Sequence, residues 1–160
     1  MSTHTISVFV ENHSGALSRI SGLFSSRGYN ISSLTVAETD DPTVSRMTIV
    51  VGGEEEILEQ IVKQLNRLID VIKVIDFAGE EAIEREMVLV LVDASKSNRH
   101  EVIELAALFG AKIASVAHTS ITIEMMGSRR NIDDFLALVR PYGIKEIVRS
   151  GTIAIAQNKK

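Results

Sequence analysis

The spacing of hydrophobic residues in the first half of the chain switches several times between the alternation of a strand and the repeat of a helix. Residues 5–11 alternate apolar and polar side chains, which predicts a strand with one face more buried than the other. From Leu17 to Phe24 the apolar positions recur at helical spacing, and Gly28 supplies a C-terminal stop. The predicted elements are strand 5–11, helix 17–24, strands 31–39 and 44–51, helix 54–65 and strand 71–77.

The second half repeats this order of elements without repeating the residues. Its predicted elements are strand 86–93, helix 98–109, strands 113–116 and 121–125, helix 132–139, and short strands 144–148 and 153–155. The last helix must end near Pro141 and Gly143, because proline removes a helical hydrogen bond and clashes with the preceding turn.

The order β-α-β-β-α-β is that of the ferredoxin-like arrangement, an antiparallel sheet with both helices on one face. We therefore predict an α+β protein with two ferredoxin-like modules. The stretch at about 78–85 is small and charged, which makes it the best linker candidate. This places the boundary between an N-terminal domain of residues 1–78 and a C-terminal domain of residues 79–160.

Composition narrows the function classes. The 17 basic and 21 acidic residues give a formal charge of −4, and the basic residues are scattered, so no nucleic-acid footprint is present. The chain has no cysteine, which removes disulfides and thiol catalysis and fits a reducing compartment. No apolar run has the length of a membrane span and no secretory signal is present, so we expect a cytoplasmic protein.

Motifs that carry catalysis are missing. The sequence has no dinucleotide fingerprint, P-loop, nucleophile elbow or HExxH motif. The four histidines are far apart in sequence, so we predict no metal site. Asp133, Asp134 and the acidic run 54–56 lie in first turns of predicted helices, where the helix dipole favours acids without any reaction to catalyse. We predict no catalytic residues.

The most informative segment joins the first strand to the first helix. Asn12, His13, Ser14, Gly15 and Ala16 occupy this turn, and Asn30 follows the helix. One interpretation is structural: Asn or Ser caps the helix, Gly permits an unusual turn, and Asn30 tolerates a left-handed turn. The other is a ligand site, because the free N–H groups at a helix N-terminus attract a carboxylate and an Asn side chain binds both ends of an amino acid. Spacing alone leaves both open.

A set of local sequences resembles the small subunit of acetohydroxyacid synthase, also called acetolactate synthase. The matching segments are Glu11–Arg19, Phe24 with Arg27–Ile31, Ser33–Val36, Thr39–Pro42, Ser45–Thr48, Glu84–Glu86, Phe109–Gly110 and Arg149–Gly151. The chain departs from the family at Ser115 and Ile121, where relatives often have aspartate and tyrosine, and at His13, where many relatives have an acidic residue.

This resemblance implies an N-terminal ACT domain, which is a ferredoxin-like amino-acid sensor, and the family's own C-terminal domain. It implies a noncatalytic subunit that activates a large catalytic subunit and confers feedback inhibition by valine. Thiamine diphosphate, Mg and FAD are then expected on the large subunit and no cofactor on this chain. The matching ligand positions are Asn12, Gly15 and Asn30, with His13, Ser14, Ala16 and Ile31 as lining.

A homodimer through the ACT domains is also expected. The strand after Asn30 should lie at a sheet edge, where unpaired N–H and C=O groups allow pairing with a second copy. Two alternatives remain open: an ACT sensor that serves another enzyme or a transcription regulator, and a stand-alone enzyme on a ferredoxin-like scaffold. The first would need an effector domain and the second a catalytic constellation, and the sequence offers neither.

Overall fold

The computed structural model describes residues 2–78, 81–95 and 97–157, and the chain forms two compact units. The first unit comprises Met1–Ile83 together with Thr152–Lys160, and the second comprises Glu84–Gly151. The predicted division at residue 78 differs from this one, because the last strand joins the first unit. Within the predicted linker, residues 79 and 80 lie outside the described residues, and Ala82 already begins a strand.

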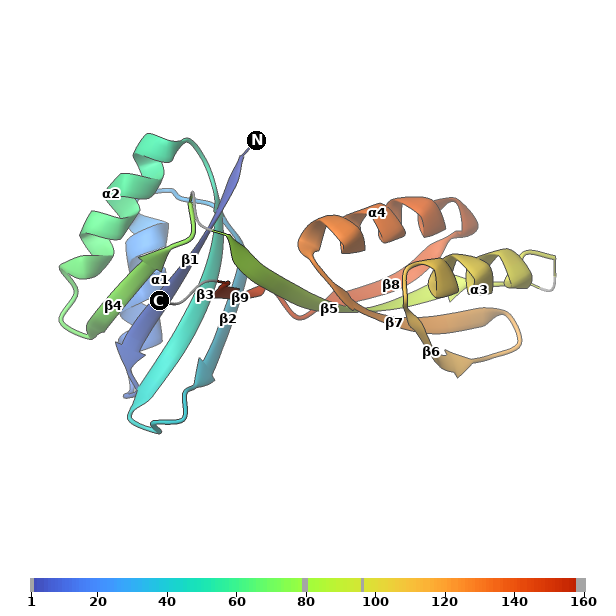
Figure 1. The fold of residues 1–160 in the computed structure, drawn as a ribbon, viewed down its shortest axis with the longest axis horizontal. Helices are drawn as coiled ribbons and strands as arrows, with labels where there is room; N and C mark the ends of the chain where they lie inside the picture. Colours follow the sequence, from blue (N-terminus) through green and yellow to red (C-terminus); the bar gives the residue numbers. More distant parts are fainter. Residues whose placement is uncertain (1, 79–80, 96, 158–160) are drawn as a thin grey trace. The chain divides into compact units, whose positions relative to one another are not determined.

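The first unit has the predicted β-α-β-β-α-β order. Its elements are β1 (Thr3–Glu11), α1 (Ala16–Ser26), β2 (Ile31–Glu38), β3 (Val44–Gly52), α2 (Glu55–Asn66) and β4 (Val71–Asp76). The strands form an antiparallel sheet in the order β2-β3-β1-β4, and α1 and α2 cover one face of it (Figure 1). The ferredoxin-like prediction is confirmed, and β2 lies at an edge as expected.

The core of this unit lies between the sheet and its two helices. Alternate residues of β1, namely Ile6, Val8 and Val10, pack with Phe24 of α1 and Leu58 of α2, and each is at most 1% exposed. The helices therefore contribute an apolar stripe each, as their periodicity predicts.

The opposite face of this sheet is also covered. The alternation of apolar and polar residues along β1 predicts instead that this face is exposed. Ser7 points to that face, yet it is 0% exposed. Two side chains of the sheet bond to the segment around Thr152: Thr35 Oγ1 donates to the Thr152 carbonyl at 3.2 Å, and Ser33 Oγ accepts from the Thr152 N–H at 2.8 Å. The C-terminal segment thus lies on the face away from α1 and α2.

The second unit repeats the architecture. Its elements are β5 (Ala82–Asp93, which begins in the first unit), α3 (Arg99–Leu108), β6 (Lys112–Val116), β7 (Ser120–Gly127), α4 (Arg129–Val139), the 3-10 helix η1 (Arg140–Tyr142) and β8 (Ile144–Arg149). The sheet order β6-β7-β5-β8 is equivalent to that of the first unit, and β9 (Ile153–Ala156) also pairs with β5. None of the helices among the described residues is long and apolar enough to cross a membrane.

Candidate functional site

Asn12 ties the turn between β1 and α1 to the hairpin between β2 and β3. Its backbone N–H donates to the Thr43 carbonyl at 2.7 Å, and its side-chain Nδ2 donates to Glu38 Oε1 and to the Pro42 carbonyl, both at 3.0 Å. Asn12 does not cap α1, so the capping interpretation is wrong for this residue. Its side chain instead fixes the position of the turn beside the end of β2.

Gly15 is the residue that precedes α1, and its φ of 92° lies in the left-handed region that glycine tolerates best. A Cβ atom at this position would meet only the Arg19 guanidinium, at 3.7 Å, so the backbone conformation and not crowding requires glycine. No side chain caps α1. The Ala16 N–H donates to the His13 carbonyl at 3.4 Å, and the N–H groups of Leu17 and Ser18 remain available to an anion.

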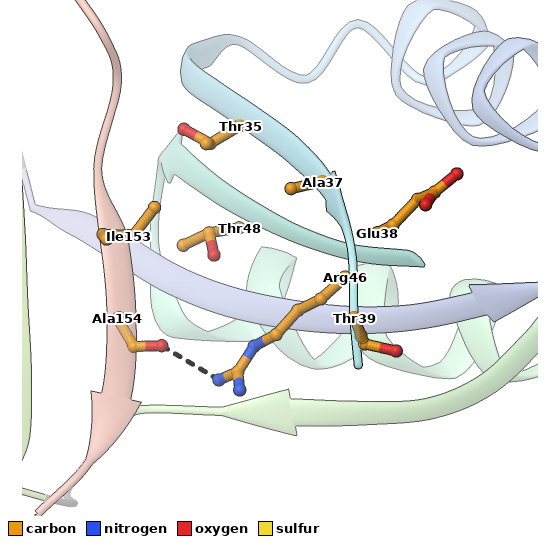
Figure 2. Close-up of a pocket in the computed structure, with 8 residues that line it drawn as sticks. All are labelled: Thr35, Ala37, Glu38, Thr39, Arg46, Thr48, Ile153 and Ala154. Carbon is orange, nitrogen blue, oxygen red and sulfur yellow. Dashed lines mark hydrogen bonds between the residues drawn. The ribbon is translucent and has the colours of Figure 1, made fainter. Parts of the chain in front are cut away.

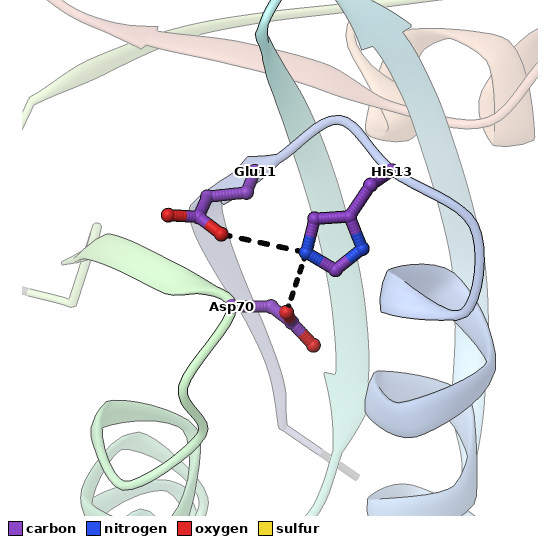
Figure 3. A group of neighbouring side chains, drawn as sticks. All are labelled: Glu11, His13 and Asp70. Carbon is purple, nitrogen blue, oxygen red and sulfur yellow. Dashed lines mark ion pairs between the residues drawn. The ribbon is translucent and has the colours of Figure 1, made fainter.

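His13, in the same turn, lies in a cluster of charged side chains (Figure 3). Its Nε2 lies 2.7 Å from Asp70 Oδ1 and 3.4 Å from Glu11 Oε2. The other Asp70 oxygen accepts from the Arg19 guanidinium of α1. Asp70 lies between α2 and β4 and is only 3% exposed, whereas the His13 side chain is 43% exposed. A buried carboxylate thus joins the turn to the first helix.

Protonated His13 satisfies both of its ring nitrogens in this cluster. Its Nδ1 lies 3.1 Å from the Ser14 carbonyl, and only an imidazolium donates from both nitrogens at once. The Ser14 carbonyl is the main cause that raises the pKa of His13; Asp70 and Glu11 raise it further, and desolvation opposes them.

Glu11, His13 and Asp70 each offer a ligand atom within 4.8 Å of the others, which could hold a metal ion. Arg19 beside Asp70 already supplies a positive charge that would repel a cation. The sequence prediction named no metal site, and we assign the cluster to ion pairing. Sequence reasoning missed Asp70 and Arg19 as parts of the site, because nothing local signals that residues 51 positions apart meet.

Asn30 lies at the opposite end of β2 from the turn. Its carbonyl accepts from the Gly52 N–H, whereas Asn12 contacts Glu38, the last residue of β2. Eight residues of extended strand separate Asn30 from Glu38, a distance of about 26 Å. One chain therefore does not bring Asn30 together with the turn.

The remaining predicted residues have different surroundings. No non-glycine residue of the described chain has positive φ, so Asn30 does not adopt the left-handed turn that the structural interpretation allowed. Ser14 is exposed, and Ile31 is partly buried and packs against the core. Ala16 is only 4% exposed and is one of the buried residues of α1.

Comparisons with known proteins cover both units. Residues 6–73 match a family model described as "AHAS small subunit-like ACT domain", and residues 85–158 match one described as "Small subunit of acetolactate synthase". An acetolactate synthase small subunit of Haemophilus influenzae is 50% identical over 156 residues, covering 97% of this chain and 96% of its own length. A probable acetolactate synthase small subunit of Archaeoglobus fulgidus is 46% identical over 157 residues, covering 98% of each.

A solved structure agrees with these matches. The crystal structure of the acetolactate synthase small subunit from Thermotoga maritima has a TM-score of 0.87 and 34% sequence identity, and the match covers 100% of both chains.

Proposed function

Since this chain belongs to the acetolactate synthase small-subunit family, whose members are noncatalytic regulatory subunits, we propose that it activates the catalytic large subunit and confers feedback inhibition by valine. The reaction chemistry, with thiamine diphosphate, Mg²⁺ and FAD, then belongs to the large subunit. The complex would work in the cytoplasm, where amino-acid biosynthesis takes place.

The second part of the proposal is a ligand site shared by two copies of the chain. It is supported by the distance between Asn30 and the turn, because one copy alone does not bring them together. β2 is an edge strand, and its helix-side residues Leu34 and Val36 are 37% and 40% exposed. Leu17 of α1, at the same side, is 45% exposed. An apolar sheet edge of this kind favours pairing with a second β2 strand.

Symmetry then completes the site. If two β2 strands pair antiparallel about a two-fold axis through Leu34, Asn30 of one copy lies opposite Glu38 of the other. Because Glu38 contacts Asn12, this register brings Asn30 beside the partner's turn. The valine carboxylate would accept from the α1 N-terminus at Gly15, and its ammonium group would lie between Glu38 and the Asn30 side-chain carbonyl.

Reconstitution with the large subunit tests this proposal. Adding the chain should raise acetolactate formation and introduce valine sensitivity, and the two subunits should co-purify. Gly15→Asp should abolish the valine response, since its carboxylate repels that of the ligand. Gly15→Ala is the matched control, because any L-residue at φ 92° shares the strain of about 1–2 kcal/mol without the charge.

Asn30→Ala should weaken valine by roughly five- to 150-fold, the scale of a buried hydrogen-bonding group worth about 1–3 kcal/mol. Calorimetric titration beside thermal melts separates this from unfolding. Wild-type valine affinity in both Gly15→Asp and Asn30→Ala would refute the shared site, and an unchanged rate and valine response on reconstitution would refute the function.

A further inference from the structure

A cavity of about 280 Å³ lies within the first unit, between β9 and the strands β2 and β3 (Figure 2). It faces away from α1 and α2, and none of the residues from Asn12 to Ala16 lines it. Its polar side chains come from the edge strand β2 and from its neighbour β3, and Ile153 and Ala154 of β9 form one wall.

Arg46 of β3 brings a positive charge into this cavity. Its Nε donates to Ser7 Oγ at 3.1 Å, its Nη2 donates to the Ala154 carbonyl at 2.9 Å, and its Cζ lies 4.9 Å from the centre of the Phe9 ring. No carboxylate of the described residues pairs with it, unlike Arg19 and Arg149, and burial lowers its pKa. A partly desolvated guanidinium is stabilised by an anion.

Thr48 adds a free hydroxyl to the lining of the cavity. This residue lines the cavity and is 4% exposed, yet its hydroxyl makes no hydrogen bond with the described residues. Thr35, directly across from it on β2, donates its own hydroxyl proton to the Thr152 carbonyl. Because Thr48 lines the cavity and its hydroxyl has no partner among the described residues, this O–H group is available to donate to an acceptor inside the cavity.

The other walls limit the size and the chemistry of a ligand. Ala37 and Ile153 line the cavity with aliphatic groups. Glu38 borders it too, but its carboxylate accepts from Asn12, and in Figure 2 it points away from Arg46 and Thr48. The volume of about 280 Å³ is just below the roughly 300–1,000 Å³ of pockets for drug-sized ligands, so the cavity suits a small ligand.

We propose that this cavity binds a small monocarboxylate with a short aliphatic body. The carboxylate accepts from the Arg46 guanidinium and the Thr48 hydroxyl, and the aliphatic body packs against Ala37 and Ile153. Because β9 supplies one wall, the bound acid contacts the sheet and the C-terminal strand at once. Binding therefore stabilises the position of β9 on the sheet, independently of the amino-acid site at Gly15.

Titration of the purified full-length chain with isobutyrate tests the proposal, by calorimetry and by amide chemical shifts, with chloride matching the ionic strength. Isobutyrate should bind saturably, shift the amides of Thr48 and Ile153, and raise the melting temperature. Isobutyramide, which has the same shape and no charge, should bind at least about ten-fold more weakly.

Variants then locate the site. Thr48→Val keeps the side-chain shape and should weaken isobutyrate about ten-fold or more, since it removes a hydrogen bond to a charged group. Arg46→Lys keeps the charge but loses the planar fork and should weaken it similarly. Thr122→Val, the same change in β7, should leave binding unchanged, and so should Gly15→Asp.

Four results would each overturn the proposal. Three of them are no saturable binding by the folded wild-type chain at millimolar isobutyrate, equal binding of isobutyramide, and undiminished binding in both Thr48→Val and Arg46→Lys. The fourth is loss of isobutyrate binding in Gly15→Asp, which would show that the acid uses the amino-acid site instead. Because these titrations contain neither valine nor the large subunit, their outcome is separate from that of the proposed function.

Discussion

Asp70 is expected to hold the turn between β1 and α1 in place, and replacing it by asparagine tests this. The Asp70 side chain pairs with His13 and with Arg19, and its backbone carbonyl accepts from the Glu11 N–H at 2.9 Å. Asp70→Asn preserves the shape of the side chain and the backbone bond. It removes the negative charge on which both side-chain partners depend.

The expected loss of stability in Asp70→Asn follows from the burial of Asp70 and from the charges of its two partners. The substituted amide still offers one oxygen to Arg19, but its NH₂ group would face the protonated His13, so one charge-assisted bond is lost outright. Such a bond contributes about 1.5–3 kcal/mol. We do not expect the larger cost of an unpaired buried charge, because the Arg19 side chain is 51% exposed and can be rehydrated. At about 2–4 °C per kcal/mol for a chain of this size, the melting temperature should fall by roughly 3–12 °C.

Thermal melts followed by circular dichroism at pH 6 measure this change. Asp133→Asn is the matched control, because the Asp133 side chain is 52% exposed and pairs with Arg149 at the surface. That pair should contribute at most about 1 kcal/mol. Equal shifts in the two variants, or a wild-type melting temperature in Asp70→Asn, would show that burial of Asp70 adds nothing and would refute the reasoning.

Three further outcomes are expected. Because the pKa of His13 is raised, its proton stabilises the fold below about pH 6.5, and this contribution is lost as pH rises through the raised pKa. Thermal melts should therefore show the melting temperature of His13→Gln closest to that of the wild type at high pH. Val36→Asp should give a monomer in light scattering, and Val148→Asp, a control on the edge strand β8, should leave the assembly unchanged. Phe135→Ala should cost about 3–5 kcal/mol in denaturant unfolding, because Phe135 is 0% exposed in the core of the second unit.

Hydrophobic periodicity predicts most of the fold because it reports local burial. It fails for Ser7, whose side chain is polar but fully buried. The reason is a contact distant in sequence: Arg46 bonds to Ser7 and to Ala154, so the C-terminal strand covers a face that alternation marks as open. Arg46 was the available signal that this face is covered, because an arginine inside an otherwise buried strand requires partners.

The candidate site divides in the same way. The turn with Asn12 and Gly15 could be predicted, because contiguous residues set its backbone conformation. Asp70 could not, since its link to His13 depends on how α2 leads into β4. Asn30 shows a different limit. The strand after it was predicted, but the bonds from Asn12 to Glu38 and Pro42, which place the turn at the far end of that strand, depend on contacts distant in sequence.

The distance between Asn30 and the turn has a thermodynamic consequence for the proposed site. A ligand that needs both the turn of one copy and Asn30 of another binds only the assembled pair, so its apparent affinity must rise with protein concentration until the pair is saturated. The ion pairs of Asp70 act before that step, because a turn already held by His13 and Arg19 loses less conformational freedom when the ligand arrives. Disrupting the turn should therefore weaken valine at every protein concentration, whereas disrupting the β2 edge should weaken it most when the chain is dilute. Valine titrations of Asp70→Asn and Val36→Asp at several protein concentrations distinguish the two effects, and parallel behaviour of the variants would contradict a site shared between copies.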